Sequence, residues 1–203
     1  MSHDRNAAFS PAGLSPAPIV SGRWLQLIYR LPSEPSAPRT AIWRETKRLG
    51  ALSLQHGVCL LPLCETNRAA YGRLARRVEE YGGEAMVLET ASPNDAWQER
   101  TAARFNAARD EEYEEVVDET ERFREEIARE RRKGKFTFAE LEDEESNLER
   151  LRKYLAQVRA RDTLGAQGGA RAVAEVEECA VVLEAFAQEI YERQSPPPAD
   201  EGL

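Results

Sequence analysis

Histidine and cysteine are scarce in this 203-residue chain, which has two histidines and three cysteines. Cys59, Cys64 and Cys179 form no CxxC pair, so the sequence predicts neither a disulfide framework nor a zinc site. His3 and His56 have no cysteine or carboxylate at ligand spacing. We therefore expect no metal site and no cofactor.

Long apolar runs are also missing from the sequence. No stretch is long enough to span a bilayer, and no charged N-terminal region leads into an apolar segment. We therefore expect a cytoplasmic protein with no membrane partner. The GxSxG nucleophile elbow, the phosphate loop and the GxGxxG fingerprint are absent as well. Because no motif names a reaction, we expect that the protein is not an enzyme.

Charge is plentiful but unevenly distributed. The chain has 36 acidic and 28 basic residues, with a net charge of −8, so its bulk charge does not favour a polyanion. Between Arg23 and Gly83, however, ten Lys/Arg stand against five Asp/Glu, a local excess of +5. The sequence therefore predicts an anion-binding face in the first half of an acidic protein.

An α+β domain is predicted over residues 22–91. The expected order is β-α-β-β-α-β, which is the ferredoxin-like pattern of two helices on one face of a four-stranded antiparallel sheet. The helices that follow in the chain are expected to cover the other face. Apolar runs and turn residues place strands at 24–31, 51–55, 58–61 and 84–89, and helices at 39–49 and 66–81.

A helical domain is predicted over residues 94–193. Apolar residues recur every three or four positions, which predicts amphipathic helices over 95–133, 138–161 and 170–193. Gly134 separates the first two, so we expect an antiparallel, coiled-coil-like helical hairpin. A flexible leader (1–21) and a disordered tail (194–203) are expected to flank the two domains, since both are proline-rich and poor in apolar residues.

Basic side chains mark the two helices expected in the α+β domain. Arginines and lysines on one surface can neutralise nucleic-acid phosphates. Ordinary solvated helix faces, with some charges paired to Glu45, Glu79 and Glu80, would give the same pattern. The candidate DNA-binding residues are Arg39, Arg44, Lys47, Arg48, Arg73, Arg76 and Arg77.

The stretch RFNAARDEEY, residues 104–113, is the most unusual part of the first long helix. An oxyanion site there would need Arg109 together with a second arginine from a facing helix. The alternative is a ladder of ion pairs within the helix, which would position it on the sheet. The candidate oxyanion-binding residues are Arg104, Arg109, Arg159 and Arg161.

Six separate blocks of the chain share one resemblance: WLQLIYRLPSEPS (24–36), RTAIWRETKRLGA (39–51), GVCLLP (57–62), RFNAARDEEY (104–113), KFTFAELEDEESNLERLRKYL (135–155) and VRARD (158–162). These blocks resemble the N-terminal domain of the ChrB-type chromate-resistance regulators. The resemblance implies a role in sensing chromate and in regulating a chromate-efflux operon. Full-length members also carry a second, C-terminal domain, and we expect the present sequence to lack it.

A looser similarity links the first domain to the ferredoxin-like domains of phenylacetate-pathway repressors and of small CRISPR adaptation nucleases. Those nucleases carry an aspartate just after the first strand. The same place here reads Tyr29-Arg30-Leu31, with no carboxylate before Glu34. The similarity therefore implies a domain that binds or dimerises and does not cut nucleic acid.

These observations predict a non-enzymatic regulatory protein linked to chromate resistance, which acts as a homodimer with DNA and with chromate or another oxyanion as partners. A protein-interaction or dimerisation module without nucleic-acid binding is the alternative, since the acidic charge and the long amphipathic helices suit it. A metal-dependent nuclease or reductase is a third hypothesis.

Overall fold

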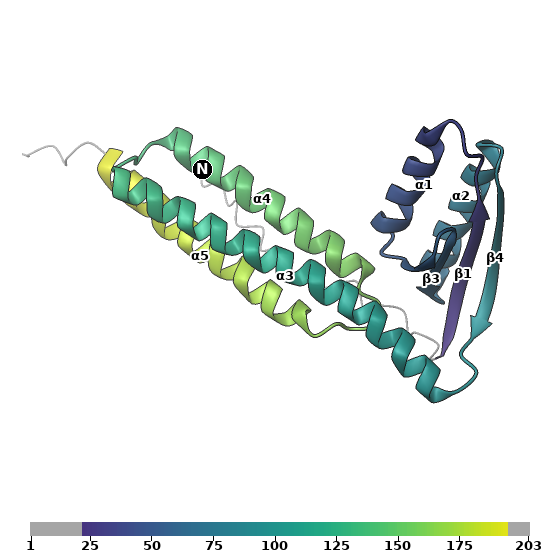
Figure 1. Ribbon diagram of the computed structural model, residues 1–203. Coiled ribbons are helices and arrows are strands. Elements are labelled where there is room, and N and C mark those ends of the chain that lie inside the picture. Colours follow the sequence, from purple (N-terminus) through teal and green to yellow (C-terminus); the bar gives the residue numbers. More distant parts are fainter. Residues whose placement is uncertain (1–21, 195–203) are drawn as a thin grey trace, which may run out of the picture.

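The structure is a computed structural model that describes residues 22–194 (Figure 1). The expected leader lies outside these residues, and so does the expected tail apart from Gln194, the last residue of a helix. The elements are β1 (Arg23–Arg30), α1 (Ser36–Arg48), β2 (Leu52–Gln55), β3 (Val58–Pro62), α2 (Glu65–Glu80), β4 (Glu84–Ala91), α3 (Asp95–Lys133), α4 (Phe138–Arg161) and α5 (Gly168–Gln194).

The four strands form one antiparallel sheet in the order β2-β3-β1-β4. This confirms the predicted α+β class and the four-stranded antiparallel sheet. The strand β1 is central and pairs with β3 and β4, so that Leu27 stands opposite Cys59 on one side and Val87 on the other.

Two helices, α1 and α2, cover one face of the sheet (Figure 1). Leu25 and Leu27 point to this face and are fully buried. They share a core with Ile42 of α1 and with Leu74 and Val78 of α2. The apolar stripes of the two helices therefore pack on the sheet, which leaves their basic stripes on the outside.

Within residues 22–194, the opposite face of the sheet is covered only at one end, contrary to the expectation that the later helices would cover it. Trp24 lies under α3, where its indole nitrogen donates a hydrogen bond to Gln98 at 2.8 Å. Farther along the same face, Ile28, Met86 and Leu88 are 37%, 57% and 38% exposed. Ile28 and Met86 are direct cross-strand partners, so these side chains form one apolar patch.

The long helix α3 belongs to two cores. Phe105 is buried in the core of the sheet domain, beside Trp24 at a ring-centroid distance of 6.3 Å. Two turns later, Tyr113 and Val116 are buried in a second core with residues of α4 and α5. The two cores therefore meet on α3 between Phe105 and Tyr113, which is the stretch that the sequence singles out.

The second core is a bundle of three helices, in which α3, α4 and α5 lie side by side (Figure 1). Phe123, Ile127 and Phe186 are among its buried residues. Gly134 ends α3 with a φ of 70°, where a residue without Cβ is favoured. Thr137 then caps α4 by accepting a hydrogen bond from the backbone N–H of Glu140. No helix within residues 22–194 is long and apolar enough to cross a membrane.

Candidate functional site

The seven predicted DNA-binding residues all lie on α1 or α2, which pack against each other on one face of the sheet. We call the outward side chains of these helices the basic layer. The two helices carry eight Lys/Arg and four Asp/Glu, a net charge of +4 (8 − 4). Since the whole chain carries −8, everything outside them carries −12 (−8 − 4). The basic layer is therefore the positive region of an acidic protein.

Some cations of the basic layer are held by neighbours. Arg48 forms an ion pair with Glu45 at 2.5 Å, and this pairing raises the pKa of Arg48. The Nε of Arg77 donates a hydrogen bond to the hydroxyl of Tyr81 at 3.3 Å. Both arginines are on exposed helix surface, so water screens these contacts and they leave the side chains free to rearrange.

Other cations of the basic layer have no acidic partner. Within residues 22–194 no carboxylate lies within 4 Å of four exposed members, which are Arg44, Lys47, Arg73 and Arg76. Unpaired surface cations on neighbouring helices can meet phosphate groups without first breaking an ion pair. Both alternatives raised by the sequence, phosphate contacts and solvated helix faces, are compatible with this geometry.

Two of the four predicted oxyanion-binding residues come together where the two cores meet. Arg109 of α3 is 4% exposed, and its Nη2 lies 3.1 Å from one oxygen of Glu112. Arg161, the last residue of α4, donates from Nε and Nη2 to the other oxygen of Glu112 at 3.1 and 2.8 Å. One carboxylate therefore joins two arginines from different helices, and we call these three residues the junction triad.

The junction triad is covered by the sheet domain. Gly50, between α1 and β2, is buried with a φ of 69°, and a Cβ there would overlap Nη1 of Arg109. Burial lowers the pKa of Arg109, the charge of Glu112 raises it, and the charge of Arg161 lowers it again. The triad holds two cations and one anion, and the nearby carboxylate of Asp162 also raises the pKa of Arg109, so two carboxylates stand beside the two arginines.

Several polar atoms around the junction triad lack a protein partner. Among the described residues, no hydrogen bond reaches Nε and Nη1 of Arg109, Oδ1 of Asn106 or Oγ1 of Thr163, although all are buried. Buried polar atoms are usually satisfied by protein or by water. The junction therefore has donors and acceptors to offer to a small polar ligand or to ordered water.

A second set of contacts closes the outer side of the junction. The hydroxyl of Tyr113 donates to Asp162 at 3.1 Å, and burial raises the pKa of this tyrosine. Asp162 also accepts from the backbone N–H of Gly165 and Ala166, and Asp110 accepts from the N–H of Gly168 at 2.8 Å. These bonds tie the loop between α4 and α5 to α3.

The other two predicted oxyanion-binding residues, Arg104 and Arg159, are exposed and outside the junction triad. Sequence reasoning missed Glu112 and Gly50. Glu112 follows Arg109 by three residues, the spacing at which side chains meet on a helix. The sequence marked Gly50 only as the residue that ends a helix. Its contact with Arg109 depends on tertiary packing, which no local sequence pattern reveals.

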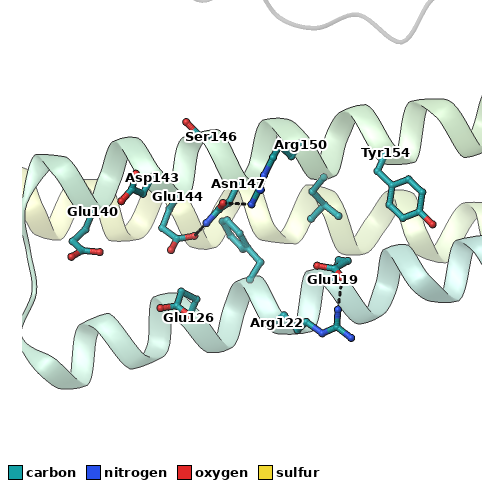
Figure 2. A pocket seen from close by; sticks show the side chains of 12 residues that line it. Glu119, Arg122, Glu126, Glu140, Asp143, Glu144, Ser146, Asn147, Arg150 and Tyr154 are labelled. Carbon is teal, nitrogen blue, oxygen red and sulfur yellow. Dashed lines mark hydrogen bonds and ion pairs between the residues drawn. The ribbon is translucent and has the colours of Figure 1, made fainter.

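A groove of about 920 Å³ lies between α3 and α4 (Figure 2). Two arginines, Arg122 and Arg150, stand among its carboxylates, and no three candidate metal ligands gather within residues 22–194. A groove of this charge is unsuited to an oxyanion. Its carboxylates are Glu119, Glu126, Glu140, Asp143 and Glu144.

Comparison with known proteins adds one match. A family model described as "Protein ChrB, N-terminal" matches residues 39–197. No curated protein and no solved structure matches the chain. The matched residues include α1 from Arg39 onward, all of α2, the seven predicted DNA-binding residues and all of the junction triad. The match covers more than half of the sequence and confirms the resemblance seen in its motifs. The chain therefore belongs to the family of ChrB N-terminal domains.

Proposed function

We propose that this protein is a non-enzymatic cytoplasmic regulator linked to chromate resistance, and that it binds DNA through the basic layer. The observation that carries the proposal is family membership, since the match spans the basic layer and the junction triad together. The link to chromate is the role that the resemblance implies for ChrB-type proteins.

The basic layer supports the DNA-binding part of the proposal. Arg44 and Lys47 on α1 and Arg73 and Arg76 on α2 are exposed cations on two packed helices. A protein that neutralises several phosphates releases counterions, so its affinity falls steeply with salt. Titration of the protein's own upstream DNA at several salt concentrations tests the proposal.

The junction triad supports a response to an oxyanion. The carboxylate of Glu112 presents two oxygens to Arg109 and Arg161, much as a tetrahedral oxyanion would. An oxyanion that displaces Glu112 would add charge-assisted hydrogen bonds and would pair the buried guanidinium of Arg109. Because the triad lies between the two cores, this exchange would alter how the sheet domain sits on the bundle.

The proposal also includes a more specific fold for the α+β domain. We infer that the α+β domain is ferredoxin-like. The element order β-α-β-β-α-β and the antiparallel sheet order β2-β3-β1-β4 support this inference, as do two helices on one face. Such a domain is a scaffold for binding, and its function depends on the side chains it displays.

A homodimer is the second candidate function, and the exposed apolar patch favours it. Ile28, Met86 and Leu88 share one sheet face, and monomers rarely leave such patches open. Arg30 and Glu84 form an exposed ion pair beside the patch. A two-fold axis through the patch can therefore bring Arg30 of one copy to Glu84 of the other.

A further inference from the structure

A second hollow lies in the sheet domain, between α1 and the hairpin of β2 and β3. Its volume is about 570 Å³, within the range of small-molecule sites. Ser53 and Cys59, which are cross-strand partners, form part of its floor together with Tyr29. One side of α1 forms its wall through Arg39, Thr40, Trp43, Thr46 and Lys47. We call it the hairpin pocket.

The charge of the hairpin pocket is positive. Arg39 and Lys47 line it, His56 stands at its hairpin end, and no aspartate or glutamate lines it. Arg30 is also part of the rim, but its guanidinium pairs with Glu84 at 3.1 Å. Anions are therefore the ligands that this pocket favours.

An exposed tryptophan stands between the two cations. Trp43 is 54% exposed, although large aromatic side chains usually pack into a core. Arg39 precedes it by four residues and Lys47 follows it by four, so all three share one side of α1. Eight residues of helix span about 12 Å, which places the cations at either end of the indole.

The polar groups of the pocket are available for a ligand. Nη1 of Arg39 donates to the carbonyl oxygen of Pro32 at 2.9 Å, which fixes the guanidinium and leaves its other N–H groups free to donate. The hydroxyls of Thr40 and Ser53 donate only long bonds, at 3.4 and 3.5 Å, to backbone oxygens. Each can turn toward a ligand at small cost.

We propose that the hairpin pocket binds a free nucleoside monophosphate. Its base stacks on Trp43, its phosphate pairs with Arg39, and Lys47 attracts the dianion. The pocket is far larger than a lone tetrahedral oxyanion needs, and an aromatic wall beside an anchored arginine suits a ligand with both a ring and a phosphate. Arg39 and Lys47 also belong to the basic layer, but this site does not require that the protein bind DNA.

Isothermal titration calorimetry on the full chain, without DNA, tests the site. The probes are AMP, GMP, CMP and UMP, with adenosine and inorganic phosphate as the two halves of a ligand. The variants are Trp43→Ala and Arg39→Ala. Trp97→Ala is a matched control, since Trp97 is also 54% exposed but lies on α3, and Arg73→Ala removes a basic-layer cation outside the pocket.

We expect at least one monophosphate to bind at least tenfold more tightly than adenosine or phosphate alone. Arg39→Ala and Trp43→Ala should each weaken its binding roughly tenfold, whereas the two controls leave it unchanged. No binding at millimolar ligand, equal binding of phosphate alone, or equal weakening in the controls would each overturn the proposal. Binding of single-stranded DNA without any free monophosphate would overturn it too.

Discussion

A Cβ placed on Gly50 would overlap Nη1 of Arg109 and would lie 3.0 Å from Cδ of Arg161. The backbone between α1 and β2 thus lies directly on two arginines of the helical bundle. This close approach joins the sheet domain to α3 and α4 at the junction triad. Predictions about stability and about oxyanions both follow from it.

Gly50→Ala should destabilise the protein by roughly 2 to 4 kcal/mol, because it adds a clash with Arg109 to the cost of a positive φ. Gly82→Ala is the matched control. Gly82 has a φ of 72° but no atom within 4 Å of the added Cβ, so this change should cost only about 1 kcal/mol. Urea unfolding of both variants measures the difference, and equal destabilisation would contradict the close approach at Gly50.

Glu112→Gln should make the protein more responsive to tetrahedral dianions. The change leaves Arg109 and Arg161 without their shared carboxylate, which should lower stability by roughly 3 kcal/mol in anion-free buffer. Sulfate or chromate should then raise the melting temperature of this variant more than that of the unaltered protein. Glu111→Gln, on the exposed side of α3, is the control and should behave as the unaltered protein does. If neither sulfate nor chromate raises the melting temperature of Glu112→Gln more than that of the unaltered protein, the triad is a structural ion-pair network and not an oxyanion site.

Glu144 predicts a pH dependence of stability. It is 3% exposed, and burial raises its pKa, although a hydrogen bond from Asn147 opposes the shift (Figure 2). In the folded state this carboxyl therefore keeps its proton to higher pH than in the unfolded state. Ionisation of Glu144 costs stability as the pH rises above its unfolded pKa.

Glu144→Gln removes that cost. Its melting temperature should exceed that of the unaltered protein by a few degrees at pH 7, and the gain should disappear near pH 4. Thermal melts monitored by circular dichroism across this range measure the effect. The same change at exposed Glu145 is the control. A gain that persisted at low pH would show that burial of the charge is not its cause.

Met86→Asp should dissociate the proposed homodimer, because it puts a charge in the centre of the exposed sheet patch. Val181→Asp is the control, since Val181 is 62% exposed on α5 and away from the sheet. Size-exclusion chromatography with light scattering gives the mass of each. A monomeric unaltered protein, or a Met86→Asp variant of dimer mass, would exclude this interface.

The sequence predicted the helices and strands well, because their signals are local. The bounds of α3, 95–133, agree with the structure, since Asn94 caps its start and Gly134 ends it. The helix α1 begins at Ser36, three residues before the predicted start, because Pro38 fits the first turn of a helix and does not precede it.

The arrangement of these elements was harder to predict. The apolar pattern predicted the two strands that contain Ile28 and Met86. It could not show that the sheet face these residues share is largely uncovered within residues 22–194. The junction triad was found in part: the sequence analysis named Arg109 and Arg161, but it missed Glu112, the carboxylate that pairs with both. Pairings between distant elements follow from tertiary packing, which local patterns do not carry.

Binding to the protein's own upstream DNA tests the central claim most directly. Fluorescence anisotropy titrations at several salt concentrations, with and without chromate, should show that the logarithm of the binding constant falls linearly with the logarithm of the salt concentration. Reversal of two unpaired cations, Arg44→Glu with Lys47→Glu, should weaken binding and reduce the slope by about one for each phosphate that the variant no longer neutralises. Arg152→Glu on α4 is the control and should leave both the DNA affinity and its salt dependence unchanged.

The account predicts salt-dependent binding that requires the basic layer and changes with chromate. Absence of salt-sensitive binding in both the presence and the absence of chromate would contradict it.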